Sequence, residues 1–425
     1  MNLSNICFSL SGTLSYIFYI FIALIALLVM ITIHEFGHFI AGRKLDFKIN
    51  EFAVGFGKVL WKTTTKDGIV ISLRLIPLGG YCAFDGEDED SGNPNAFNNK
   101  EPWKRLIVLF NGAFFNFLSA VLISFIMLFT FGYGDLVQVK KVEDYATNLI
   151  DVTESSSDKL QEGDIIYAIN GVETNFLNDQ YFITLMSGVK VGSEFTVKVK
   201  RDGEFRELTL INGKKFEKTA DGNYRLLNGD FVSIEKNENK FTIKLVSDPS
   251  VVVATVESKD DDELFTFVYK DHKYVFDKVN SELYSGYLGI SIQNYVYTVG
   301  EAFVKAVPFT CEWAWKILIL LWQIISGQMG LDGVGGPITT IGAMATYTQA
   351  SWINLLILFP LISVNLAVFN LLPFPALDGA RMVFVAIEWI RGKPISRKIE
   401  GYVHSIGLIV LFAFVIIVDA LKLFV

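Results

Sequence analysis

The sequence predicts a multi-pass α-helical membrane protein with about four transmembrane helices and an extracytoplasmic β-rich domain. Of its 425 residues, 51% are hydrophobic and 19% are charged, and the mean hydropathy is +0.39, whereas soluble globular chains carry about 25% charged residues. The apolar residues gather toward the two ends and leave a polar stretch over about 140–290. An ordinary soluble protein is therefore excluded.

Four apolar runs are long enough to cross a bilayer, which takes about 20 residues in a helix. They are Tyr16–Ile33, extending as a helix to Ala41, then Leu106–Tyr133, Trp352–Leu372 and Tyr402–Val418. A fifth stretch, Ala302–Ile325, is interrupted by Lys305, Glu312 and Lys316. We expect it to lie on the membrane surface, with a fifth span as the alternative. No basic residue precedes Arg43, so the first run lacks the charged start of a signal peptide and should be retained.

These runs divide the chain into eight segments. They are a first transmembrane helix (1–44), a cytoplasmic, membrane-associated β-hairpin loop (45–103), a second transmembrane helix (104–134), the extracytoplasmic domain (135–295), a membrane-surface amphipathic helix with a connecting segment (296–350), a third transmembrane helix (351–380), a cytoplasmic loop (381–400) and a fourth transmembrane helix (401–425). The orientation follows from ten Lys and Arg residues over 43–105 and five over 381–398, because basic loops stay in the cytoplasm.

Short strands are expected in both polar regions, where β-branched and aromatic residues alternate with Gly, Asn and Asp turns. Those of the 135–295 domain are Phe195–Lys200, Phe205–Ile211, Phe241–Val246, Ser250–Val256, Leu264–Tyr269 and Tyr274–Val279. Residues 60–81 predict two further strands around Asp67–Gly68. An edge strand there could pair with an extended peptide; a hairpin that only packs on the helices is the alternative.

The sharpest chemical signal is the pentapeptide HEFGH at His34–His38. On a helix, its two imidazoles lie one turn apart on the same face, as a tetrahedral Zn²⁺ site needs. Glu35 is placed to take a proton from a metal-bound water. Ionisable groups inside a membrane helix are costly and usually functional. The alternative is a helix end whose polar groups reach the interface.

A catalytic zinc needs a third protein ligand, and Asp378 is the strongest candidate. It follows Pro373 and Pro375, which break the helix at membrane depth, where unwound backbone is tolerated only inside protein or beside a wet cavity. The alternative role for Asp378 is the N-cap of the next helix. The other histidines, His272 and His404, do not sit in ligand-like settings.

HEFGH, the segment NLLPFPALDG (370–379) and the polar domain between them resemble the bacterial site-2 protease family, the zinc intramembrane metalloproteases, over nearly the whole chain. Further matches are Phe52–Gly57, Ile76–Tyr81 and Gly335–Ile338. The resemblance implies one catalytic zinc held by His34, His38 and Asp378, with Glu35 as the catalytic base.

The resemblance also implies substrate contacts. We assign these to Asn116, Asn370, Pro373, Gly79 and Gly80. The family usually has glycine-proline-x-x-asparagine in the second span, whereas Gly112–Asn116 keeps the asparagine without the proline. Helix packing is the alternative role for both asparagines.

Lys159–Gly171 (KLQEGDIIYAING) resembles the core of a PDZ domain, with an Asn-Gly hairpin turn, which makes the outer domain PDZ-like. Residues 213–285 exceed one PDZ domain. We favour an insertion, because no second EGD…ING occurs, over a divergent second PDZ domain.

The resemblance implies an endopeptidase of the bacterial cytoplasmic (inner) membrane that cleaves transmembrane helices of single-span proteins. Such substrates would be anti-sigma factors or remnant signal peptides, shortened first by an upstream site-1 protease, with the PDZ region as a size filter. A net charge of −8 without a long basic cluster gives no footprint for nucleic acid. Two other classes stay open: a membrane metal transporter, although no inverted repeat is visible, and a non-catalytic membrane PDZ scaffold.

Overall fold

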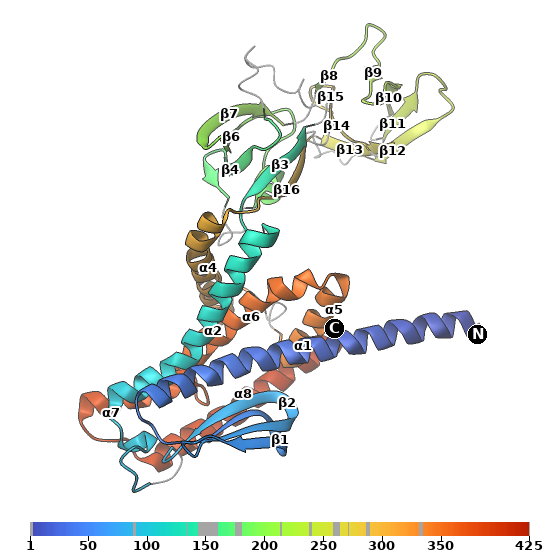
Figure 1. Ribbon diagram of the computed structural model, residues 1–425. Helices are drawn as coiled ribbons and strands as arrows, with labels where there is room; N and C mark the ends of the chain where they lie inside the picture. Colours follow the sequence, from blue (N-terminus) through green and yellow to red (C-terminus); the bar gives the residue numbers. More distant parts are fainter. Residues whose placement is uncertain are drawn as a thin grey trace. The chain divides into compact units, whose positions relative to one another are not determined.

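The computed structural model describes residues 3–87, 91–132, 134–142, 160–174, 181–212, 215–237, 240–257, 264–270, 272–285, 290–330 and 335–424. The chain forms two compact units (Figure 1). Met1–Phe131 and Tyr297–Val425 make a mainly helical unit, and Gly132–Val296 make a β-rich unit between them in the sequence.

The helical unit contains seven described helices of ten or more residues and one β-hairpin. Its elements are α1 (Leu3–Lys44), β1 (Ile49–Thr64), β2 (Val70–Phe84), the 3₁₀ turn η1 (Phe97–Asn99), α2 (Pro102–Phe131), α4 (Val299–Ile325), α5 (Pro337–Ala350), α6 (Ile353–Leu371), α7 (Asp378–Arg391) and α8 (Arg397–Phe424). Four segments are long and apolar enough to cross a membrane: Leu14–Lys44, Pro102–Phe131, Ile353–Leu371 and Lys398–Ala420. They match the four predicted runs, except that Tyr133, at the end of the second run, lies outside the described residues.

Small side chains lie where these helices cross. Ala23 and Ala26 of α1 pack with Met344 of α5, and Ala120 of α2 packs with Ile317 of α4 and Val364 of α6. Small residues let helix backbones approach closely where apolar side chains alone would not hold them together. Helices α1, α4, α6 and α7 all pack against α2.

Helix α4 covers the stretch expected at the membrane surface. It begins with a capping box, in which Thr298 Oγ1 accepts from the Glu301 backbone N–H at 3.3 Å and the Glu301 carboxylate accepts from the Thr298 N–H at 3.0 Å. The helix packs against α2 and α6 (Figure 1). Its position relative to the membrane surface stays a prediction.

Helix α5 was not predicted, since this segment was expected only to connect. Its first backbone N–H groups are bound by the carboxylate of Asp419 on α8, at 3.0 Å from Gly336 N and 3.2 Å from Thr339 N. A buried carboxylate at a helix N-terminus satisfies N–H groups that would otherwise have no partner. Here the capping residue lies about 80 positions away in the sequence.

The β1–β2 hairpin is longer than the two strands predicted over 60–81. Its register shifts, so that Glu51–Val54 pairs with Gly80–Ala83 on one side and with Val70–Leu73 on the other. The hairpin therefore folds back on itself and leaves Tyr81–Phe84 at one edge, and no further strand of the described chain pairs with it. Its inner face, which includes Phe52, packs on Phe39 of α1, Val108 of α2 and Val385 of α7.

The described residues of the β-rich unit form a six-stranded sheet and two four-stranded sheets. The first has the order β16–β3–β4–β6–β7, with β5 paired to β4; the others have the orders β12–β11–β10–β9 and β13–β14–β15–β8. Their bounds are β3 (Val137–Val142), β4 (Ile165–Ile169), β5 (Val172–Glu173), β6 (Glu194–Arg201), β7 (Glu204–Ile211), β8 (Lys215–Phe216), β9 (Tyr224–Arg225), β10 (Phe231–Asn237), β11 (Lys240–Leu245), β12 (Val252–Glu257), β13 (Leu264–Tyr269), β14 (His272–Asp277), β15 (Glu282–Ser285) and β16 (Ile290–Asn294), with the short helix α3 (Phe182–Ser187). Each of the six predicted strands overlaps one of these.

The six-stranded sheet carries the segment that resembles a PDZ core, of which Lys159 lies outside the described residues. Asn170 and Gly171 both have positive φ, 50° and 74°, and connect β4 to β5 as the expected Asn-Gly turn. Asp164 is fully buried and holds Arg201 through two hydrogen bonds of 2.6 and 2.7 Å. The PDZ likeness itself stays a prediction.

The two four-stranded sheets lie between β7 and β16 in the sequence. They share one apolar core rich in aromatic residues, which includes Phe216, Tyr224, Phe241, Phe265 and Phe276. After them the chain returns to the first sheet, where β16 pairs with β3. No helix occurs in the described part of 215–285, and this segment interrupts the six-stranded sheet in the sequence. Its assignment as an insertion stays a prediction.

Candidate metal centre and active site

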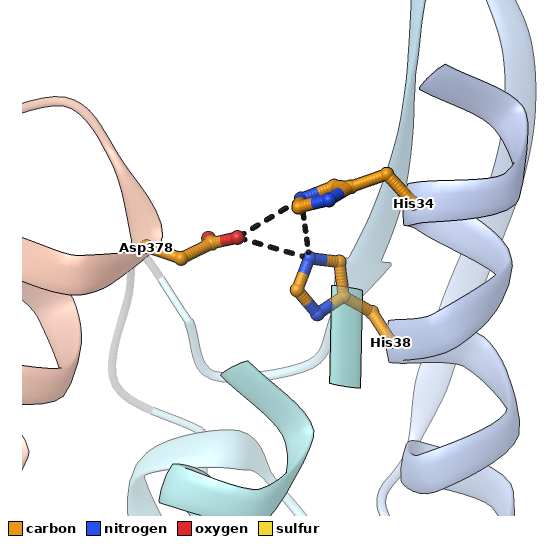
Figure 2. A group of neighbouring side chains, drawn as sticks. All are labelled: His34, His38 and Asp378. Carbon is orange, nitrogen blue, oxygen red and sulfur yellow. Dashed lines mark hydrogen bonds and ion pairs between the residues drawn. The ribbon is translucent and has the colours of Figure 1, made fainter. Parts of the chain in front are cut away.

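Two helices bring three potential metal ligands together (Figure 2). His34 and His38 lie one turn apart on α1, and Asp378 is the first residue of α7. Asp378 Oδ2 lies 3.0 Å from His34 Nε2 and 3.2 Å from His38 Nε2, and the two nitrogens are 3.2 Å apart. Ligand atoms at 2.0–2.1 Å from a tetrahedral zinc lie about 3.3 Å from one another. The three atoms thus have the spacing of a zinc ligand set.

A hydrogen bond of His38 indicates which of its two ring nitrogens carries the proton and which can bind a metal. Its Nδ1 lies 2.8 Å from the carbonyl oxygen of Val108 on α2, so we assign the ring proton to Nδ1. This leaves Nε2, on the side of Asp378, as the ring nitrogen that can bind a metal with its lone pair. Lone pairs that converge in this way are satisfied by a cation, and a carbonyl that fixes the other ring nitrogen is the usual support of a metal-binding histidine.

Two glycines allow α1 and α2 to meet at the site. A Cβ at Gly112 of α2 would lie 2.5 Å from His38 Nε2 and 2.7 Å from His34 Cε1. A Cβ at Gly37 would overlap the backbone carbonyl of Asn111. Both positions therefore require glycine while the imidazoles keep these places. In the sequence, Gly112 stands out only as the first residue of Gly112–Asn116, the segment that lacks the proline of the family's motif.

Asp378 was also considered as an N-cap, and this alternative is wrong. Helix α7 begins at Asp378 itself, and its N-cap is Leu377, which makes no side-chain hydrogen bond. The Asp378 side chain is 18% exposed and its carboxylate points at the histidines (Figure 2). Its position suits a ligand.

A cavity of about 840 Å³ opens beside the three side chains. Glu35 lines it, next to His34 and opposite the Tyr81–Phe84 edge of β2. The backbone N–H of Cys82 faces the Glu35 carboxylate. Gly80 packs next to the same side chain, since a Cβ there would lie 3.6 Å from Glu35 Cγ.

The structure brings some of the predicted substrate contacts to this cavity and not others. Asn116 and Asn370 both line it. Asn116 is fully buried, and neither its Oδ1 nor its Nδ2 has a hydrogen-bond partner among the described residues. Pro373 is exposed and Gly79 packs against the ring of Phe56, and neither lines the cavity.

The sequence of the chain matches the model of a known protein family. The model of peptidase family M50 matches residues 22–414, which include all of these side chains. The chain belongs to peptidase family M50. The predicted resemblance to the site-2 proteases is confirmed, and the chain is a metalloprotease.

Individual relatives of this M50 peptidase are distant but match along their length. A Pasteurella multocida protein whose name places it among the zinc metalloproteases is 27% identical, over 91% of this chain and 94% of that protein. The regulator of sigma E protease of Haemophilus influenzae is 26% identical, over 93% and 97%. The regulator of sigma-E protease RseP of Escherichia coli is also 26% identical, over 94% and 96%. These names support zinc as the metal.

From the sequence of this M50 peptidase, His404 was not expected to lie at the site. His404 of α8 lines the same cavity, and its Nδ1 accepts a hydrogen bond of 3.0 Å from the backbone N–H of Ala376. It does not belong to the cluster of His34, His38 and Asp378. His272 lies on β14 in the other unit. Only the packing of α8, which no local pattern reveals, relates His404 to the site.

Proposed function

We propose that this metalloprotease cleaves peptide bonds inside membrane helices, with one zinc ion held by His34, His38 and Asp378 and with Glu35 as the general base. The observation that carries the proposal is the convergence of the three ligand atoms within 4.8 Å, two of them on a segment long and apolar enough to cross a bilayer. Membership in a peptidase family sets aside the metal transporter and the non-catalytic scaffold.

The catalytic roles follow from the positions of the side chains. When bound, zinc supplies Lewis-acid polarisation of the scissile carbonyl and of the attacking water. Glu35, which lines the cavity beside His34, takes the proton from that water and passes it to the leaving amine. The unpaired amide of Asn116 lies in the same cavity and can donate to the carbonyl oxygen as negative charge develops there.

The edge of β2 is the proposed place for the substrate. A peptide bond in a membrane helix is protected by its own hydrogen bonds, and pairing with an edge strand replaces them. Tyr81–Phe84 line the cavity and pair with β1 on one side only within the described chain. Leu60, Trp61, Leu75 and Leu78 of the hairpin are exposed, which supports its association with the bilayer.

The relatives guide the inference on substrate and location. Two of them are named regulator of sigma E protease and regulator of sigma-E protease RseP. We infer an enzyme of the bacterial inner membrane that acts on single-span proteins of the anti-sigma-factor type after an upstream site-1 protease, with remnant signal peptides as a second class. The β-rich unit, PDZ-like and extracytoplasmic, would act as the size filter.

The test is zinc content and cleavage of a single-span model substrate by the purified full chain. Glu35→Gln should keep one zinc per chain and lose about 100- to 10,000-fold in turnover, because the amide cannot act as a base. His272→Ala, far from the site in sequence and in the other unit, serves as the control and should change neither quantity. Unchanged turnover by Glu35→Gln would overturn the assignment.

A further inference from the structure

The loop that carries Asp378 has an unusual backbone. Between the end of α6 and Asp378, Ala376 has φ of +80°, a region that a residue with a Cβ adopts only at a cost of about 1–3 kcal/mol. Such a conformation persists when surrounding contacts hold it. Asp378 lies two residues further along, so the conformation of Ala376 helps to set where the carboxylate points.

Helix α8 provides those contacts. His404 Nδ1 accepts from the Ala376 N–H at 3.0 Å. One turn later on the same face, Gly407 lies against Pro375, and a Cβ at Gly407 would overlap the Pro375 ring. The hydrogen bond and the close approach hold two consecutive residues of the loop from one helix face.

The far end of α8 is held as well. The buried carboxylate of Asp419 accepts from the backbone N–H groups of Gly336, Ile338 and Thr339 at 3.0–3.2 Å. Between these ends, much of α8 faces outward, with Ile406, Ile409 and Phe412 exposed. The helix is therefore fixed at two places, one of them the Asp378 loop.

We infer that His404 is a positioning residue for the metal site: by accepting the Ala376 N–H, it holds the loop so that Asp378 reaches His34 and His38. This inference rests on the proposed metal site. It predicts that zinc binding requires a hydrogen-bond acceptor at the position of His404 Nδ1 but does not require the imidazole ring itself. Asparagine places its Oδ1 near the position of histidine Nδ1, whereas leucine fills similar space without an acceptor.

The experiment compares His404→Asn and His404→Leu in the purified full chain, by zinc affinity against a chromogenic chelator and by the absorption spectrum of the Co²⁺-loaded protein. His404→Leu should weaken zinc binding about 10- to 100-fold, as losses of supporting hydrogen bonds do, and change the Co²⁺ bands. His404→Asn should stay close to wild type in both. Gly407→Ala, which pushes on Pro375, should resemble His404→Leu, and Ile406→Ala on the exposed face should change nothing.

Two results would overturn the inference: wild-type zinc affinity and Co²⁺ spectrum for His404→Leu, or equal damage by His404→Asn and His404→Leu. The variants Asp378→Asn and His34→Ala, measured alongside, keep this failure apart from that of the metal site. If they lose zinc while His404→Leu keeps it, only the role of His404 is wrong. If they too keep zinc, the proposed ligand set is wrong.

Discussion

At the scale of single residues, Gly112 controls how closely α2 approaches the two imidazoles. Gly112→Ala would place a methyl group 2.5 Å from His38 Nε2, closer than unbonded atoms tolerate. The ring has to move, and its nitrogen then leaves the common point with Asp378. We expect zinc affinity to fall at least about tenfold, on the order of other distortions of a metal site, as measured by competition with a chelator.

A glycine on another helix serves as the control, because it shows what replacing a helical glycine by alanine does away from the metal site. At Gly342 of α5, an added Cβ would meet nothing closer than Tyr16 Oη at 3.7 Å. Gly342→Ala should leave zinc binding unchanged and stabilise the helix by about 0.5–1 kcal/mol. Wild-type zinc affinity in Gly112→Ala would mean that the imidazoles do not occupy these positions in the active enzyme.

The residues of the site differed in how far the sequence could predict them. His34, Glu35 and His38 were predictable because their arrangement depends only on the geometry of one helix. Asp378 lies more than 300 positions away and was found from its broken-helix setting and the family resemblance. Gly112 and His404 were not predicted, because their roles depend on contacts between helices.

At the scale of elements, a hydrogen-bond network holds the folded hairpin beside the cavity. The Glu51 carboxylate on β1 accepts from Ser72 Oγ at 2.5 Å, from Arg74 Nη2 at 2.7 Å and from Tyr81 Oη at 2.9 Å. Burial raises the pKa of Glu51, but these three donors outweigh it, and the net pKa lies below the ordinary value of 4.5. Tyr81 begins the edge proposed for the substrate, so the network also sets the position of that edge.

The lowered pKa gives the stability of the hairpin a defined pH dependence. The contribution of ionised Glu51 is fully present above about pH 4.5 and is lost as the pH falls through the lowered folded-state pKa. Glu51→Gln should loosen the hairpin at neutral pH, by about 1–3 kcal/mol for charged hydrogen bonds, and remove this part of the pH dependence. Hydrogen exchange of residues 49–84 measures both.

The control for this prediction is the ion pair at the hairpin turn. Arg43 and Asp67 are 2.6 Å apart but about half exposed, and exposed pairs contribute about 0–1 kcal/mol. Asp67→Asn should therefore leave exchange over 49–84 nearly unchanged. Equal protection in Glu51→Gln and wild type at pH 7 would contradict the role given to the network.

Elements with local signals were predicted, and those with distant partners were not. The four apolar helices and six strands each follow from a pattern of neighbouring residues. Strand β16 pairs with β3, some 150 positions earlier, and α5 depends on Asp419 for its N-terminal contacts. Neither dependence is visible in the segments themselves. The longer extent of β1 and β2 likewise comes from the hairpin folding on itself.

At the scale of the whole molecule, all the side chains of the candidate site come from one unit. His34, Glu35, Asn116 and Asp378 lie in the helical unit, and the described residues of the β-rich unit Gly132–Val296 supply none of the cavity lining. Each unit has its own apolar cores. Chemistry and substrate selection are thus carried by separate parts of the chain in the proposed function.

The predicted orientation places the β-rich unit outside and the hairpin in the cytoplasm. Asp202, at the turn between β6 and β7, and Lys66, at the turn between β1 and β2, are both exposed. In a variant without Cys7, Cys82 and Cys311, we expect an impermeant thiol reagent to label Asp202→Cys in intact cells and Lys66→Cys only after lysis. The reverse pattern would invert the topology.

The junction between the units shows how the filter can be tested. The Tyr297 N–H donates to the Leu128 carbonyl at 3.2 Å, so the end of α2 and the start of α4 lie side by side within the helical unit. A short Gly/Ser linker can therefore join Phe131 to Tyr297 in place of the β-rich unit.

Because no side chain of the site is removed, cleavage of a short, pre-trimmed substrate should stay within a few-fold of wild type. Cleavage of the full-length substrate, which the proposed filter would exclude in the complete enzyme, should appear. The same deletion carrying Glu35→Gln gives the background, and a folded, zinc-loaded deletion that cuts no short substrate would show that the β-rich unit is needed for catalysis.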